Sequence, residues 1–142
     1  MHSEILQPVV ALCAWTMVMW FWMYITRIPA LSKVPPETLA EIKMGTKTLD
    51  QILPPQVQWK AHNYNHLHEA PTVFYAVALA LALLGAGNGL NAQIAWFYVG
   101  MRVVHSLIQA TVNHEMYRFL AFLLSSFALM ALIVRAGLVA FA

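Results

Sequence analysis

The chain has 142 residues, of which 61% are hydrophobic and only 10% are charged, and its mean hydropathy is +0.64. A soluble domain carries roughly 25% charged residues, so the composition argues against a soluble protein and indicates an integral membrane protein. The formal charge of +2 gives no indication of nucleic-acid binding, and we expect no nucleic-acid partner. Residues 1–142 are predicted to form a single transmembrane domain.

Four apolar stretches are predicted to be membrane-spanning helices, at about residues 5–27, 60–84, 90–111 and 117–139. Stretches of about 20 residues match the thickness of the hydrocarbon core at about 1.5 Å per helical residue. The predicted fold class is therefore all-α, an integral membrane four-helix bundle. The single cysteine, Cys13, lies in the first stretch and excludes an intramolecular disulfide.

The first connection, about residues 28–59, is long and basic. Prolines punctuate it, and the segment from Pro36 is predicted to be a short helix with proline in its first turn. Five of the eight Lys and Arg residues lie in or beside the connection: Arg27, Lys33, Lys43, Lys47 and Lys60. Basic loops favour the cytoplasm, so we expect a cytoplasmic first connection and both termini on the non-cytoplasmic side. The connection could be a plain tether or a lid.

The second stretch opens with a polar segment, residues 60–71, of sequence Lys-Ala-His-Asn-Tyr-Asn-His-Leu-His-Glu-Ala-Pro. If this segment is helical, each residue advances by about 100° around the axis. His62, His66 and Glu69 then lie within about 60° of one another. Asn65 lies beside them. The start of the second stretch is therefore predicted to present a polar face.

The third stretch carries a second polar face. Residues spaced at i, i+4, i+7 and i+11 share one side of a helix, and those residues here are Tyr98, Arg102, His105 and Gln109. The fourth stretch begins with Arg118. Charged side chains in hydrocarbon are costly, so charges inside membrane spans indicate a functional site by default.

These polar residues are predicted to share one leaflet. If the helices alternate in direction, four segments lie on the same side of the membrane. These are the end of the first stretch, the start of the second, the second half of the third and the start of the fourth. They could line a ligand site between helices or between subunits. They could instead hold helices together, for example through a pair between Glu69 and either Arg102 or Arg118.

A metal site is the other chemistry that these residue types allow. Two histidines and a carboxylate on one helix face can bind iron or zinc. A di-metal bundle needs a second Glu-x-x-His set from another helix, whereas the third stretch offers His105 and no carboxylate. We therefore expect no metal.

The chain resembles the MAPEG family, the membrane-associated proteins of eicosanoid and glutathione metabolism, over essentially its whole length. Family members open their second helix with an Arg-Ala-rich, Asn-x-x-Glu pattern followed by proline. The segment from Lys60 through Asn65 and Glu69 to Pro71 is similar to that pattern.

The third stretch carries a further part of the resemblance. Its Arg102-Val-Val-His105-Ser106 is similar to the family's Arg-x-x-His-Ser/Thr motif. Some members carry a catalytic arginine sixteen residues beyond the first arginine of that motif. Arg118 stands at that distance from Arg102.

The resemblance implies a homotrimer with glutathione bound between neighbouring subunits and a lipophilic small molecule arriving from the membrane lipid. Arg118 would be the catalytic residue, because a guanidinium beside a thiol of pKa about 8.5 lowers that pKa and raises the reactive thiolate fraction. The glutathione-binding residues that it implies are Arg27, His62, Asn65, His66, Glu69, Arg102, His105 and Gln109.

The sequence also departs from the family pattern. With Glu69 as the anchor, the family's asparagine three residues earlier is His66 and its arginine seven residues earlier is His62, so Asn65 is one residue out of register. This chain differs from the family pattern at three further positions. Gln109 stands where members often have a tyrosine, Phe119 where some have a serine, and Phe122 where some have a second tyrosine.

Three functions remain open. The chain could be a glutathione-dependent transferase or peroxidase acting on lipophilic electrophiles or hydroperoxides. It could be a non-catalytic protein of the same fold that binds a lipid, or an accessory, structural subunit of a larger membrane complex. The altered second-helix motif favours the last two functions, whereas Arg102, His105 and Arg118 favour the first.

Overall fold

Seven helices make up most of residues 2–142, the part of the chain that the computed structural model describes. Helices account for 79% of the chain, and no strand occurs within the described residues. In chain order the helices are α1 (Leu6–Ser32), α2 (Pro36–Lys43), α3 (Leu49–Ile52), α4 (Pro55–His66), α5 (Ala70–Leu83), α6 (Leu90–Ala110) and α7 (Glu115–Ala140).

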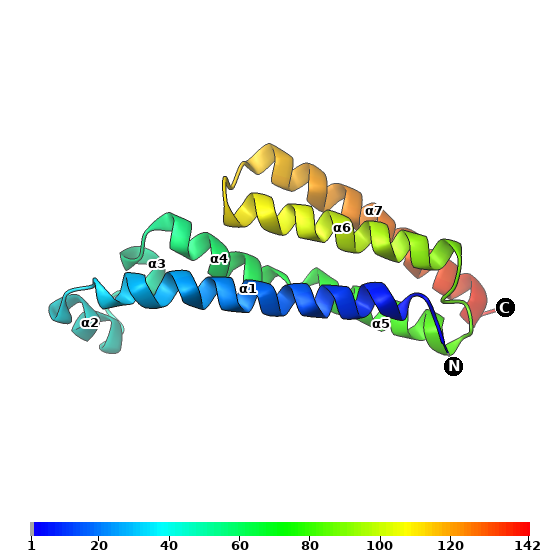
Figure 1. Ribbon diagram of the computed structural model, residues 1–142, viewed down its shortest axis with the longest axis horizontal. Coiled ribbons are helices and arrows are strands. Elements are labelled where there is room, and N and C mark those ends of the chain that lie inside the picture. Colours follow the sequence, from blue (N-terminus) through cyan, green and yellow to red (C-terminus); the bar gives the residue numbers. More distant parts are fainter. Residues whose placement is uncertain (1) are drawn as a thin grey trace.

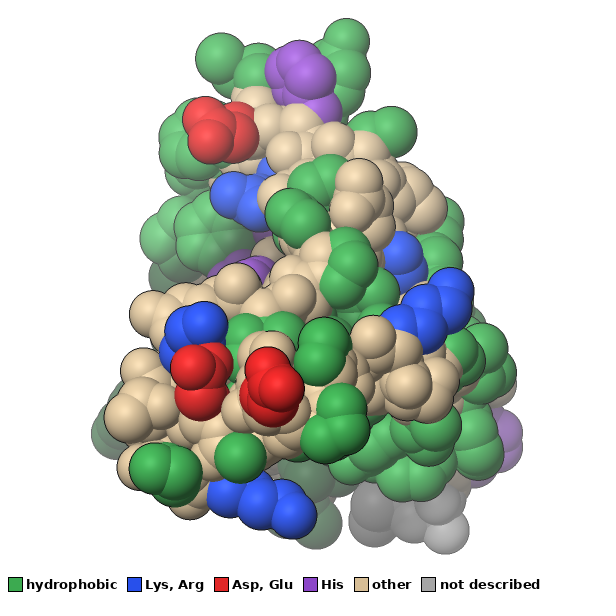
Figure 2. All heavy atoms as spheres, turned by 90° about the vertical axis from the view of Figure 1, so that its left-hand side faces the viewer, with side chains coloured by type: hydrophobic (Ala, Val, Ile, Leu, Met, Phe, Trp, Pro, Cys, Tyr) green, Lys and Arg blue, Asp and Glu red, His purple; other side chains and the backbone are tan. Residues whose placement is uncertain are grey.

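The long helices run lengthwise beside one another, with both termini at one end of the molecule and α2 and α3 at the other (Figure 1). Helix α6 packs on α7, α1 and α4, and α5 packs on α7 and α1. Figure 2 looks onto the end that carries α2 and α3 and shows acidic and basic side chains gathered there. The short helix predicted from Pro36 is present as α2.

Three helical segments among the described residues are long and apolar enough to cross a membrane, namely Leu6–Ser32, Pro55–Leu83 and Glu115–Ala140. Helix α6 has 21 residues, and its apolar character is interrupted by Arg102 and His105. These lengths and compositions fit an integral membrane protein.

The helix predicted over residues 60–84 is divided into α4 and α5. Proline has no backbone N–H, and its ring clashes with the carbonyl four residues earlier. A helix continued through Pro71 would lose the hydrogen bond to the carbonyl of Leu67, and here the helix breaks so that Pro71 occupies the first turn of α5. The break falls at residues 67–69, where Glu69 adopts φ −98° and ψ −95°.

The connection between the first two long helices is shorter in the structure than the predicted range, residues 28–59. Helix α1 continues through Pro29 to Ser32, and α4 begins at Pro55 rather than near residue 60. Gln58 of α4 ties these ends together, because its Nε2 donates to the carbonyl of Leu49 at 2.5 Å and its Oε1 accepts from Arg27 Nη2 at 3.2 Å. The α2 and α3 segment thus lies against the ends of α1 and α4.

Polar contacts close the opposite end of the molecule. The backbone N–H of Glu4 donates to Asn88 Oδ1 at 2.8 Å, and the Glu4 carboxylate accepts from the N–H of Gly89 at 2.9 Å. Asn91 Nδ2 donates to the carbonyl of Ala86 at 2.7 Å, and Asn91 Oδ1 accepts from Arg135 Nε. The N-terminal segment, the α5–α6 turn and the end of α7 are therefore fastened together.

Candidate functional site

The polar stripe of α6 lies inside the molecule. Tyr98, Arg102 and His105 are 1%, 1% and 3% exposed, and Gln109 is half-buried. The stripe faces inward because α6 packs against α1, α4 and α7. Tyr98 stacks on Phe74 of α5, with ring centroids 4.4 Å apart and an interplanar angle of 19°. Sequence spacing alone predicted this stripe as one face.

The buried polar atoms of this region lack partners. Within residues 2–142, none of the three guanidinium nitrogens of Arg102 has a hydrogen-bond partner. The same holds for Tyr98 Oη, His105 Nδ1 and Ser106 Oγ. An unsatisfied buried donor or acceptor costs about 1–3 kcal/mol, and more when it is charged. Such a concentration calls for a ligand, ordered water or a neighbouring subunit.

Asn63 of α4 belongs to the same unsatisfied set. Its side chain is 1% exposed, and both Oδ1 and Nδ2 lack partners among the described residues. The predicted polar face of this segment carries His62, His66 and Glu69 and does not include Asn63. Leu67 was the signal that could have found it, because it is the apolar residue four positions on and is buried on the same face as Asn63.

A pocket of about 270 Å³ opens where α4, α6 and the start of α7 meet; it is lined by His66, His105, Glu115, Arg118, Phe119 and Phe122. The rings of His66 and His105 lie 5.1 Å apart, centroid to centroid, and Phe122 stacks on His66 at 6.2 Å. Arg118 is half-buried, and its Nη1 donates to Asn113 Oδ1. The pocket thus joins one cation, one carboxylate, two imidazoles and an apolar wall.

The structure brings some predicted site residues together and directs others elsewhere. His66, His105 and Arg118 line one pocket, and Arg102 lies one helical turn from His105. By contrast, the exposed His62 places Nε2 at 3.3 Å from Asp50 Oδ1 of α3.

Asn65 and Arg27 also lie outside this pocket. Asn65 is exposed, and Arg27 of α1 donates to Gln58. No group of three or more His, Cys, Asp or Glu side chains is placed to hold a metal ion anywhere in the described part of the chain.

Glu69 does not pair with an arginine as the sequence suggested. Its carboxylate lies 3.1 Å from His66 Nδ1, and its side chain is 70% exposed. Within residues 2–142, neither Arg102 nor Arg118 forms an ion pair with it. Glu69 lies in the break between α4 and α5, where its carboxylate pairs with His66 and faces outward.

Comparison with known proteins matches one family model. The model of the MAPEG family matches residues 5–138. No curated protein and no solved structure gave a match. The matched range runs from the residue before α1 to near the end of α7, so it contains the α6 stripe and the whole pocket around Arg118.

Removing the charge of Glu69 should have a small effect on stability. We expect Glu69→Gln to lower the free energy of unfolding by less than about 1 kcal/mol, because exposed ion pairs contribute little. Thermal unfolding in detergent measures this, with Glu37→Gln, an exposed acidic residue of α2, as the matched control. A loss of several kcal/mol for Glu69→Gln alone would show that the carboxylate holds a buried cation.

Proposed function

Because the chain belongs to the MAPEG family, we propose that it is a membrane-embedded, glutathione-dependent transferase or peroxidase that acts on lipophilic electrophiles or hydroperoxides. The observation that carries the proposal is the guanidinium of Arg102, which is 1% exposed and has no acceptor in the described chain. A buried charge is costly unless it is paired. An anionic ligand would supply the missing partner.

The unsatisfied atoms around Arg102 fit glutathione in kind. Glutathione has two carboxylates, an amino group, two peptide groups and a thiol, so it offers both acceptors and donors. Arg102 would bind a carboxylate, for which the forked guanidinium is suited. Asn63 and Ser106 supply neutral donors and acceptors on the facing helix α4 and on α6. Gln109, whose buried Oε1 also lacks a partner, extends the set.

Arg118 is the proposed catalytic residue. When bound, glutathione supplies the sulfur nucleophile. The Arg118 guanidinium lies in the pocket with His66 and His105, and a nearby cation favours a thiolate over a thiol. Asn113, which accepts a hydrogen bond from Arg118, would orient the guanidinium. Arg118 thus stabilises negative charge at the reacting sulfur.

The apolar wall of the pocket suits a lipophilic second substrate. Phe119 and Phe122 line it and are 56% and 36% exposed. Both project from the start of α7, a helix long and apolar enough to cross a membrane. A substrate dissolved in the bilayer could therefore reach the pocket along α7 without crossing water.

The proposed membrane arrangement is a four-helix bundle with four spans. It would comprise α1, the α4–α5 pair, α6 and α7. The basic residues of the first connection favour a cytoplasmic location for it, with both termini on the other side. The pocket around Arg118 would then open toward the cytoplasm, where glutathione is made available.

A second candidate function is a non-catalytic protein of this family that binds a lipid or serves as an accessory subunit of a larger membrane complex. The observation that favours it is the changed start of the second span. His62 turns to Asp50 and Asn65 is exposed, so two of the motif residues do not line the pocket.

We propose that the protein is a homotrimer, because the polar side chains of α4 and α6 exceed what one chain pairs internally. Native mass spectrometry in detergent should give the mass of three chains of 15.9 kDa. A spectrum with monomer alone, under conditions that preserve the helical circular-dichroism signal, would contradict the trimer.

Arg102 should be essential for glutathione binding and dispensable for folding. A buried charge without a partner carries a desolvation cost that an apolar side chain of similar length does not, so Arg102→Met should unfold at the same or a higher temperature than wild type. The stabilisation of wild type by added glutathione should disappear in the variant. An equal glutathione-induced shift in both proteins would exclude Arg102 from the binding site.

Arg118 should be essential for turnover. With glutathione and a model aryl halide, we expect Arg118→Ala to lower kcat by on the order of 100- to 1000-fold, the usual effect of removing one group that stabilises developing charge. Arg135→Ala, at the far end of the same helix, is the matched control and should retain wild-type turnover per folded molecule. If wild type shows no glutathione-dependent turnover and no thermal shift with glutathione, the proposed enzyme activity is wrong and the non-catalytic function replaces it.

A further inference from the structure

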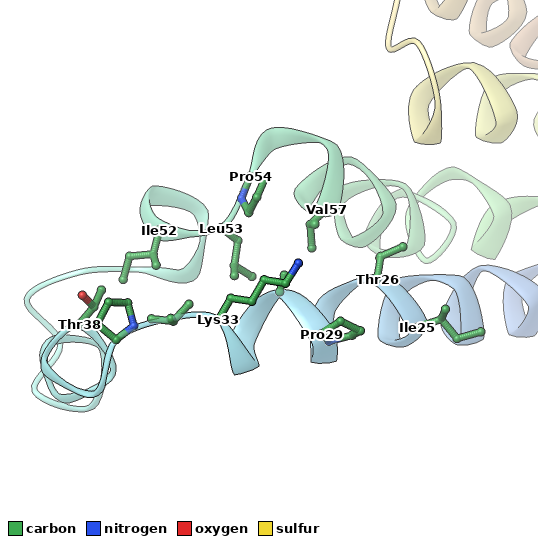
Figure 3. A pocket seen from close by; sticks show the side chains of 12 residues that line it. Ile25, Thr26, Pro29, Lys33, Thr38, Ile52, Leu53, Pro54 and Val57 are labelled. Carbon is green, nitrogen blue, oxygen red and sulfur yellow. The ribbon is translucent and has the colours of Figure 1, made fainter.

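A second, larger pocket lies away from the Arg118 site, at the end of the molecule that carries α2 and α3. It has a volume of about 620 Å³ and lies between the last turns of α1, the start of α2 and the α3–α4 corner (Figure 3). Its lining residues are Ile25, Thr26, Pro29, Ala30, Lys33, Val34, Pro35, Thr38, Ile52, Leu53, Pro54 and Val57. None of them belongs to α6 or α7, so the proposed glutathione chemistry makes no use of this pocket.

The lining is apolar except for three side chains. Thr26 is engaged in its own helix, since its hydroxyl donates to the carbonyls of Trp22 and Met23. Thr38 contributes a second hydroxyl, and Lys33 contributes the only charge. Figure 3 shows the Lys33 side chain extending from the end of α1 across the pocket, with its ammonium group toward α4. The pocket therefore combines an apolar interior with one cation.

The cation of Lys33 has no carboxylate partner among the described residues. At this end of the molecule Glu41 and Asp50 are engaged with Lys47 at 2.9 Å and with His62 at 3.3 Å, and the exposed Glu37 forms no ion pair with Lys33. Arg27, in the same last turns of α1, likewise has only the neutral Gln58 as partner. The end of α1 thus carries positive charge that no described acidic side chain neutralises.

At its position the pocket can contact both the acyl chain and the headgroup of a lipid. It lies at the end of α1, a helix that is long and apolar enough to span a membrane. Ile25, which lines the pocket, and Ile28, beside it on α1, are 69% and 61% exposed, as expected for side chains that face acyl chains. Lysine just beyond such a helix extends its ammonium group to the headgroup level. The volume falls within the range of about 300–1,000 Å³ found for small-ligand pockets.

We propose that this pocket binds one acyl chain of an anionic phospholipid from the surrounding bilayer, with the lipid phosphate paired to the ammonium group of Lys33. The apolar lining excludes water from the chain, and the phosphate neutralises the unpaired cation. Basic side chains next to a membrane span attract acidic lipids in the same way. The site would anchor the α2–α3 segment against the membrane, and it does not depend on glutathione.

Retention of defined lipids by the purified protein tests the proposal. Protein delipidated in detergent is incubated with phosphatidylglycerol or with phosphatidylcholine of the same acyl chains, and bound lipid is counted by native mass spectrometry. We expect at least fivefold more phosphatidylglycerol than phosphatidylcholine on wild type. Lys33→Gln should lower phosphatidylglycerol to the phosphatidylcholine level. The control Lys43→Gln, at the exposed end of α2 and outside the pocket, should match wild type.

A second variant tests the apolar part of the site separately from the charge of Lys33. Ala30→Phe fills the pocket and should lower the retention of both lipids, while thermal unfolding verifies that it folds. Equal retention by Lys33→Gln and wild type would overturn the proposal, as would full competition by water-soluble glycerophosphate or stronger retention of free oleate. Glutathione-dependent turnover should be unchanged in Lys33→Gln, so failure of the lipid site and failure of the glutathione site give different results.

Discussion

A buried guanidinium without an acceptor is the constraint on which the rest of this structure depends. Arg102 is enclosed by its own helix and its neighbours, and Tyr98 and His105 on the same stripe add further unpaired polar atoms. Buried polar groups of this kind are satisfied by ordered water, a ligand or a neighbouring subunit. The packing of α6 against α1 and α4 therefore encloses polar atoms that the described chain does not itself satisfy.

A proline sets the geometry of the pocket. By ending the helix before α5, Pro71 lets α4 and α5 pack independently. His66, at the last residue of α4, can then lie against His105 and Phe122. Glu69, in the break, lies 3.1 Å from His66 with its side chain 70% exposed, and no carboxylate of the described chain pairs with the buried Arg102.

Periodicity predicted much of the fold and half of the candidate site. The α6 stripe was predictable because that helix is continuous, so spacing alone fixes which residues share a face. The buried face at the start of the second span does not follow from the spacing of its histidines, because the helix breaks before Pro71 and because Leu67, not the histidines, marks that face. Asn63 was therefore missed, and His62 was assigned to a face that turns to Asp50. Partners for Arg102 outside the chain lie beyond what any helical spacing can specify.

The fastening of the N-terminal segment to the α5–α6 turn also governs the order of assembly during synthesis. Glu4 forms hydrogen bonds with Asn88 and Gly89, which lie 84 and 85 positions further along the chain. At about 5–20 residues per second, a ribosome needs roughly 4 to 17 s to add that length. During this interval α4 and α5 are made and can pack on α1, whereas α6 does not yet exist and the Glu4 carboxylate lacks its partner at Gly89. Closure of that end is thus a late event, which can occur only after the turn preceding α6 has been made.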